Sequence, residues 1–246
     1  MAARILIPPE AVARDRITVS DPAQVHHLLH VLRVRPGDPL ECFDGAGHSY
    51  VGRVLQRRRQ AVMVAIEARR GDEAPQAVRL ILAQALIKPE RFAWVVQKAT
   101  ELGVERLVPV AAARTTIRPV SGRLERQVER WRRVSREAAR QCGRRDVPQI
   151  EPPRPFDRVV PALAQDARLI MPTLAVPAVP LKEGLADLRG AEVVAALIGP
   201  EGDFTPEEAA LAQRHGALAV SLGRLTLRSE TAAVATLAIL RYAIDT

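Results

Sequence analysis

Short apolar segments at close spacing mark the first part of the chain. They are Arg4–Pro8, Leu40–Phe43, Ser49–Leu55 and Ala61–Ala68. Each has the length of a strand, and Asp44-Gly45-Ala46-Gly47 is a hairpin turn signal between two of them. A short helix over Ala23–Leu32, opened by Asp21-Pro22, interrupts the series. This pattern predicts a small β-barrel domain.

Beyond the polar break at Gly71–Pro75, strand-length apolar runs alternate with helical patterns. The expected strands are Val78–Leu86, Val104–Val110, Ala167–Met171, Val193–Ile198 and Ala217–Leu222. The expected helices are Glu90–Leu102, Arg123–Gln141, Phe156–Leu163, one that starts after Thr205, and Thr231–Ile244. Because this alternation is typical of an α/β fold with a parallel sheet, we expect two domains, residues 1–71 and 72–246.

Two glycine loops stand out in the second domain. Gly199-Pro200-Glu201-Gly202 ends the run Val193–Ile198, and Gly223 ends the run Ala217–Leu222. Both loops follow the carboxyl ends of parallel strands, the edge at which open α/β sheets bind ligands. Two such loops at one edge would let backbone approach a flat ligand closely. The alternative is that the glycines only make turns.

Helix-start signals follow both loops. Thr205-Pro206 with Glu208 forms a capping box. Ser229 is a candidate cap for the last helix, and Glu230 favours the positive end of that helix. The last helix is apolar nearly all round, which predicts that it is buried.

The composition favours a nucleic-acid partner and argues against a membrane partner. Lys plus Arg is 36 against 28 for Asp plus Glu, a net charge of +8, and nearly all of the basic residues are arginine. The planar guanidinium group of arginine binds phosphate through paired N–H groups. The excess of positive charge therefore favours a nucleic-acid partner. Apolar runs fall short of the roughly 20 residues that span a bilayer, and a signal-peptide segment is absent, so we expect no membrane partner and a cytoplasmic location.

Metal and redox chemistry have little support. Cys42 and Cys142 are far apart and make no metal motif. His26, His27 and His30 lack a cysteine or acid at matching spacing. We therefore expect no metal site.

Six segments together resemble a known family. They read HLLHVLRVRPG from His27, then FDGAGHSY, QKATELGVERLVPV, EAARQCGRRDVPQI, IGPEGDFTPEE and LGRLTLRSETA. Over nearly its whole length the chain resembles the uridine N3-methyltransferases of small-subunit ribosomal RNA, called methyltransferase E of that RNA. These enzymes belong to the knotted SPOUT class, which uses S-adenosylmethionine (SAM). The last two segments carry most of the specificity.

The resemblance implies more than the pattern does. It implies a PUA-like N-terminal barrel that binds RNA, and a C-terminal SPOUT α/β domain closed by a deep trefoil knot. It also implies a homodimer with a SAM site near the subunit interface, and ribosomal RNA or the 30S subunit as substrate. The cofactor loops of the family fall on Met171, Leu197, Ile198, Gly199, Pro200, Glu201, Gly202, Leu222, Gly223, Leu225, Leu227 and Ala232.

Five basic residues are candidate RNA contacts: Arg4, Arg33, Arg35, Lys88 and Arg114. The chain departs from the family around Arg114, where the usual acidic neighbour is missing. It also has Pro172-Thr173 where relatives often carry an acid or an amide. Both departures leave the roles of those positions open.

The family arginine falls on Arg228, which we expect to be catalytic. Methylation at N3 of uracil requires loss of a proton, and the resulting anion spreads onto two carbonyl oxygens that a fixed cation would stabilise. The alternative is that Arg228 only pairs with Glu201 or Glu230 to order the loop. Two other functions are also considered: a SPOUT enzyme for transfer RNA or a ribose 2′-hydroxyl, and a non-catalytic RNA-binding assembly factor.

Overall fold

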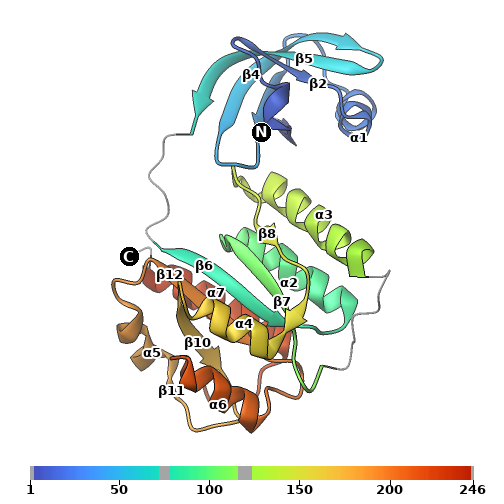
Figure 1. Ribbon diagram of the computed structural model, residues 1–246. Helices are drawn as coiled ribbons and strands as arrows, with labels where there is room; N and C mark the ends of the chain where they lie inside the picture. The colour runs from blue at the N-terminus through green and yellow to red at the C-terminus, as the bar shows by residue number, and fades with distance from the viewer. Residues whose placement is uncertain (1–2, 72–77, 116–123, 245–246) are drawn as a thin grey trace. The chain divides into compact units, whose positions relative to one another are not determined.

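A computed structural model describes residues 3–71, 78–115 and 124–244 of the protein (Figure 1). These fall into two compact units. The first consists of Met1–Ala74 and Ala139–Val147, and the second of Pro75–Ala138 and Pro148–Thr246. The segment 139–147 therefore belongs to the first unit although it lies far along the sequence.

The first unit is built on a five-stranded sheet with the order β1-β3-β4-β5-β2. The strands are β1 Ala3–Leu6, β2 Arg16–Val19, β3 Pro39–Phe43, β4 Ser49–Arg58 and β5 Ala61–Arg70. β1 pairs with β3 in parallel, and the other pairs are antiparallel. Three of the four predicted strands agree closely with β3, β4 and β5, whereas β2 was not predicted, because it offers only two apolar positions.

The helix predicted over Ala23–Leu32 is irregular. It consists of α1 (Pro22–His26), capped by the Asp21 side chain, and a π-helical turn, η2 (His27–Val31). A short 3-10 turn, η1 (Pro9–Ala11), precedes it. Leu28 of the π turn is fully buried among the apolar residues of the sheet. Arg33, just beyond this turn, has a left-handed backbone with φ of 53°.

The second unit contains an eight-stranded sheet whose strands all pair in parallel. Its path is β11-β13-β10-β12-β6-β7-β8, and β9 also pairs with β7. The strands are β6 Arg79–Ala85, β7 Arg106–Ala111, β8 Gln149–Ile150, β9 Arg154–Pro155, β10 Arg168–Pro172, β11 Val179–Pro180, β12 Val193–Ile198 and β13 Leu218–Ser221. β10 lies between β12 and β13, so the loops after all three strands reach the same edge.

Helices cover both faces of this sheet (Figure 1). They are α2 Pro89–Glu101, α3 Leu124–Cys142, α4 Phe156–Leu163, α5 Leu181–Gly184, the 3-10 turn η3 Leu185–Leu188, α6 Pro206–Arg214 and α7 Ser229–Ile244. Residues of α2, α3 and α7 pack on one face, and residues of α4 and α6 on the other. The predicted alternation of strands and helices is confirmed.

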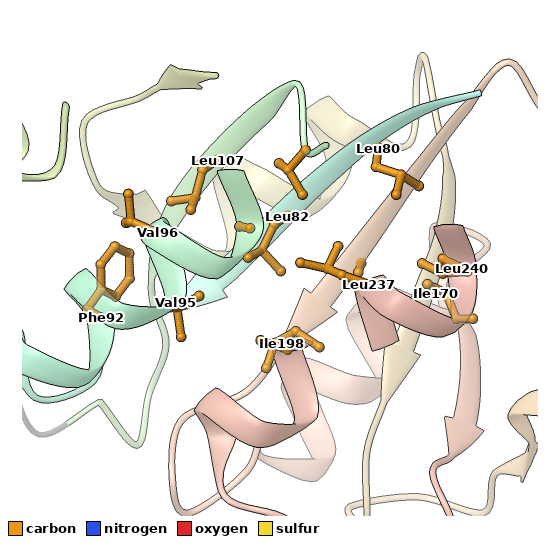
Figure 2. Close-up of a cluster of buried hydrophobic side chains, with 14 of the residues drawn as sticks. Leu80, Leu82, Phe92, Val95, Val96, Leu107, Ile170, Ile198, Leu237 and Leu240 are labelled. Atoms are coloured by element: carbon orange, nitrogen blue, oxygen red, sulfur yellow. The ribbon is translucent and has the colours of Figure 1, made fainter. Parts of the chain in front are cut away.

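The central strand β6 shows why residues 80–83 are all apolar. Leu80 and Leu82 join the cluster with α2 and α7, which Figure 2 shows, while Ile81 and Ala83 join the cluster on the opposite face. Successive residues of a strand point to opposite faces, so a strand covered on both sides needs no polar positions. Each fully buried aliphatic side chain stabilises the fold by roughly 1.5–3 kcal/mol.

Helix α7 differs from its prediction. It was expected to be buried all round, but the exposed fraction is 39% for Ile239 and 78% for Tyr242. Its other side is buried, with Leu237 and Leu240 in the core. α7 therefore presents exposed apolar residues on its outer face.

Candidate cofactor site

Three loops form a pocket at the carboxyl edge of the parallel sheet. They follow β10, β12 and β13, and the first turn of α7 adds one wall. Both Gly199 and Gly223 line this pocket, so the prediction that the two glycine loops meet at one edge is confirmed. Most of the lining residues are glycine, proline or aliphatic, and a few are polar, a surface suited to a flat, mostly apolar ligand with a few polar edges.

The two glycines have different reasons to be glycine. A Cβ on Gly199 would lie 2.9 Å from Asp203 Oδ1 and 3.1 Å from the Phe204 nitrogen. Gly223 instead has open space around it but a φ of 122°, a conformation that side chains disfavour. The first loop therefore needs glycine for close approach, and the second needs it for its turn.

Nine of the predicted cofactor residues line the pocket: Ile198, Gly199, Pro200, Glu201, Leu222, Gly223, Leu225, Leu227 and Ala232. Met171 and Leu197 lie instead in the buried core, one residue behind lining residues. Gly202 is outside the lining and accepts a hydrogen bond from Arg114. These three would act on a ligand only through the residues beside them.

Asp203 connects two of the loops, and it was not predicted from the sequence. Its Oδ2 accepts hydrogen bonds from Thr173 Oγ1 at 2.9 Å and from the Leu174 nitrogen at 2.6 Å. Its Oδ1 accepts from the Phe204 nitrogen, and its backbone has a φ of 59°. Thr173, whose role the sequence left open, thus donates its hydroxyl to the acid of the neighbouring loop.

A buried polar junction lies beneath the pocket. Gln84, at the end of β6 and fully buried, donates from Nε2 to Ser229 Oγ at 2.9 Å. Ser229 Oγ in turn donates to the Gly199 carbonyl oxygen at 2.5 Å. The hydroxyl predicted to cap α7 therefore joins α7 to the first glycine loop. Gln84 was missed because it stands inside an apolar run, 145 residues from its partner.

Arg91 of α2 contacts both carboxylates that had been considered as partners of Arg228. Its side chain lies 3.5 Å from Glu201 Oε1 and 3.5 Å from Glu230 Oε1. Arg228 itself is exposed, and within the described residues its side chain makes no hydrogen bond or ion pair. The alternative role for Arg228, as the ion-pair partner that orders the loop, therefore belongs to Arg91.

Arg114, a candidate RNA contact, holds the loop after β7 against the first glycine loop. It donates to the Gly202 carbonyl oxygen at 2.7 Å, and the neighbouring Ala113 nitrogen donates to Glu208 Oε1 at 2.7 Å. Glu208 also completes the predicted capping box with Thr205. Lys88 is exposed at the start of α2.

Arg4 has a structural environment in the first unit, which differs from the predicted RNA contact. Its guanidinium donates to the carbonyl oxygens of Ala139 and Arg144, at 3.0 and 2.7 Å, and lies 3.2 Å from Glu41 Oε1. It also stacks over the Phe43 ring at 4.3 Å. Only 11% of the side chain is exposed, so little of it can reach a ligand. Arg33 and Arg35 are both exposed.

Other chemistries find no support in the part of the chain that is described. No group of three or more His, Cys, Asp or Glu side chains there could hold a metal ion. Burial, together with the charge of Glu41, raises the pKa of the Cys42 thiol to about 12, so this thiol is not a nucleophile at neutral pH. None of the described helices is long and apolar enough to cross a bilayer.

The fold and the pocket define a class, and comparison with known proteins agrees with it. A family model described as RNA methyltransferase domain matches residues 74–241, and one described as RNA methyltransferase PUA domain matches residues 19–66. These two matches place the protein in a class of RNA methyltransferases that combine a PUA domain with a methyltransferase domain. More narrowly, the chain belongs to the ribosomal RNA small subunit methyltransferase E family.

Its relatives are similar over most of their length. The ribosomal RNA small subunit methyltransferase E of Synechocystis is 31% identical over 97% of this chain and 77% of its own, and that of Mycobacterium bovis is 32% identical over 90% and 84%. The crystal structure of the Neisseria gonorrhoeae enzyme bound to S-adenosyl methionine superposes with a TM-score of 0.84, at 27% identity and 98% coverage of both chains. A Legionella pneumophila methyltransferase in complex with SAM gives 0.83 at 29% identity, over 99% of this chain and 98% of its own.

Proposed function

We propose that the protein transfers the methyl group of SAM to N3 of a uridine in small-subunit ribosomal RNA. The observation that carries the proposal is the pocket formed by three loops with an exposed arginine, Arg228, next to its lining residues Leu227 and Ser229. The relatives named for ribosomal RNA methylation, and the solved structures that hold SAM, support the same cofactor and substrate class.

SAM, when bound, supplies an electrophilic methyl group on a sulfonium. The chain's own contribution is to bind and orient: Gly199–Glu201 and Leu222–Gly223 line the pocket, and Leu225, Leu227 and Ala232 provide apolar surface. Placing two reactants in line can lower a barrier by up to roughly 7–11 kcal/mol. The Gln84–Ser229–Gly199 and Asp203–Thr173 bonds fix the loops that do this.

Arg228 is the proposed catalytic residue. Its guanidinium is exposed and unpaired within the described residues, so it can face the uracil carbonyl oxygens on which negative charge develops as the N3 proton leaves. The N3 atom lies on the pairing edge of the base, so the target uridine must be unpaired. Arg33, Arg35 and Lys88 are exposed and are proposed as RNA contacts.

Three further features belong to the proposal. The first unit closes as a PUA-like barrel, and the chain after β13 passes the Gly199 loop to form a deep trefoil knot, consistent with the contact between Ser229 and Gly199.

The active form is a homodimer, supported by the exposed apolar residues Trp94 on α2 and Ile239 and Tyr242 on α7. Because its substrate is the 30S subunit or its RNA, the protein works in the cytoplasm.

Arg228→Ala tests the catalytic assignment. We expect methylation to be abolished while SAM affinity, measured by calorimetry, stays within about threefold of the wild type, because the interaction is made in the transition state. A large loss of SAM affinity would show instead that Arg228 supports the pocket.

The substrate is tested by incubating the protein with labelled SAM and either small ribosomal subunits or free RNA, followed by mass mapping of the methylated nucleotide. Label on a transfer RNA or on a ribose would identify one of the competing SPOUT activities. SAM binding absent by calorimetry would favour a non-catalytic assembly factor.

A further inference from the structure

Helix α3 separates its arginines into two sets. Arg126, Arg130 and Arg133, here called the α3 arginine row, stand four and three positions apart, which places them on one face of the helix. All three are exposed, and within the described residues none makes a hydrogen bond or an ion pair.

The other set is paired. Glu129 accepts a hydrogen bond from Arg136 at 2.6 Å and lies 3.9 Å from Arg132, whose guanidinium also donates to the Ile150 carbonyl oxygen. The Arg136 hydrogen bond is the main reason that the pKa of Glu129 is lowered, with the charges of Arg132 and Arg133 adding to it. Glu129 also stands three positions after Arg126 and four before Arg133, so its carboxylate, already hydrogen-bonded to Arg136, offsets only part of the charge of the three row arginines.

Apart from Glu129, the acidic residues near the row lie at its ends. Glu125 precedes it in the first turn of α3, and Glu137, one turn beyond Arg133, has a partner of its own. Like charges at this spacing repel and weaken a helix by a few tenths of a kcal/mol per pair. The row thus has a small cost in the free protein that an anionic ligand would remove.

We propose that the α3 arginine row binds successive phosphates of the RNA substrate. With a rise of about 1.5 Å per residue, the row covers roughly 10 Å along the helix axis. Each arginine side chain can contact one phosphate, so the row offers about three phosphate contacts to one RNA strand. Arginine forks suit phosphate oxygens better than lysine does, because they bind through two parallel N–H groups.

The topology directs this row toward the candidate cofactor site. β7 runs toward the carboxyl edge of the sheet, where Arg114 bonds to the first glycine loop, and α3 returns from that edge (Figure 1). Arg126, in the first turn of α3, is therefore the end of the row nearest the pocket edge. The inference rests on the proposed function: the strand held by the row leads away from the nucleotide being methylated.

The test is the salt dependence of RNA binding by the full-length protein. The triple variant Arg126→Gln/Arg130→Gln/Arg133→Gln should lose three phosphate contacts. Each contact on a single strand contributes roughly 0.7 to the slope of log affinity against log salt concentration, so the magnitude of the slope should fall by about 2. SAM affinity and the rate at saturating RNA should match the wild type, since the row does not line the pocket. Replacement by three lysines should restore most of the slope.

A matched control removes the same charge elsewhere in the second unit. Arg158, Arg168 and Arg214 are exposed, and two of them lie on α4 and α6, on the opposite face of the sheet. Changing all three to Gln should leave the slope within about half a unit of the wild type. An unchanged slope in the row variant, or an equal fall in the control, would overturn the proposal.

Two other outcomes are distinguishable. If the wild-type protein neither binds ribosomal RNA nor methylates it, the proposed function fails before the row is tested. If the row variant changes the sedimentation of the protein but not the salt slope, the row is a protein contact and the RNA proposal is wrong.

Discussion

At the residue scale, the site depends on side chains that no ligand needs to touch. Gln84, Ser229 and Asp203 hold three loops together through hydrogen bonds to backbone and to each other. Their polar atoms lie in or below the pocket, where a missing partner costs more than at the surface. The loops can therefore be ordered before a cofactor arrives.

Ser229→Ala removes the hydroxyl that joins α7 to the Gly199 carbonyl oxygen. We expect SAM affinity to fall about tenfold, equivalent to about 1.4 kcal/mol and within the range for a lost buried hydrogen bond. Ser229→Thr keeps the hydroxyl and should retain most of the affinity. Calorimetry at a temperature well below unfolding measures both, and equal losses in the two variants would contradict the role given to the hydroxyl.

Asp44 gives the first unit an acid-dependent stability. Burial raises the pKa of its carboxyl, but hydrogen bonds from the Ala46 and His48 nitrogens and from the His48 ring outweigh it, so the pKa lies below its ordinary 3.8. Because the folded pKa is depressed, this stabilisation is present above about pH 4 and is lost as the pH falls through the folded value. Asp44→Asn should therefore be less stable at neutral pH and lose less on acidification, as measured by urea unfolding from pH 6 to 3. A parallel acid dependence in the two proteins would contradict this.

At the scale of elements, the pattern of the chain predicts what is long and apolar. The strands β6 and β12 were predictable because burial on both faces leaves a continuous apolar run. β8, β9 and β11 have two residues each, too few to show any period. The π turn at His27–Val31 was missed because its burial still follows a helical pattern.

In the candidate site too, features with a local sequence signal were predicted and features without one were missed. The glycine loops were predicted from local signals: a strand end, a glycine and a helix start. Gln84 and Asp203 were missed because their partners lie far away in sequence, and nothing local distinguishes Gln84 from a surface glutamine or Asp203 from a turn aspartate. Arg4 was misassigned for the converse reason, since an arginine next to a strand gives no sign that three carbonyl oxygens will surround it.

Arg4→Ala should weaken the attachment of the end of α3 to β1. The change removes charged hydrogen bonds to backbone oxygens, and we expect a loss of about 2–3 kcal/mol in the free energy of unfolding. Arg16→Ala is a matched control because the Arg16 side chain, among the described residues, forms only an exposed ion pair with Asp15, and the change should cost less than about 0.5 kcal/mol. Urea unfolding compares the two, and similar losses would show that Arg4 has no special role.

At the scale of the whole molecule, the apolar outer face of α7 is the main unexplained surface. Ile239 and Tyr242 are exposed on α7, whereas Leu237 and Leu240 of the same helix are buried in the core. Exposed patches of this kind mark protein contacts. Their coverage by a second copy would account for the character of the entire helix.

Ile239→Asp places a charge on that face. Sedimentation should show self-association weakened by at least about tenfold, because an unpaired charge in a buried contact is costly. Leu55→Asp, at a residue in the first unit that is 53% exposed, is the control and should leave the association unchanged. A wild-type protein that sediments as a monomer would contradict the homodimer itself.

The membership of Ala139–Val147 in the first unit has a consequence for biosynthesis. Arg4 and Glu41 are made early, yet the carbonyl oxygens that Arg4 contacts, and the Asp146 that pairs with Gly45, come from the segment 139–147, which begins 69 residues after β5 ends at Arg70 (139 − 70). The N-terminal unit therefore cannot complete its contacts on the ribosome until residues 75–138 of the second unit have emerged. A protein fragment that ends at residue 71 would therefore lack the segment 139–147, and with it the carbonyl oxygens that Arg4 contacts.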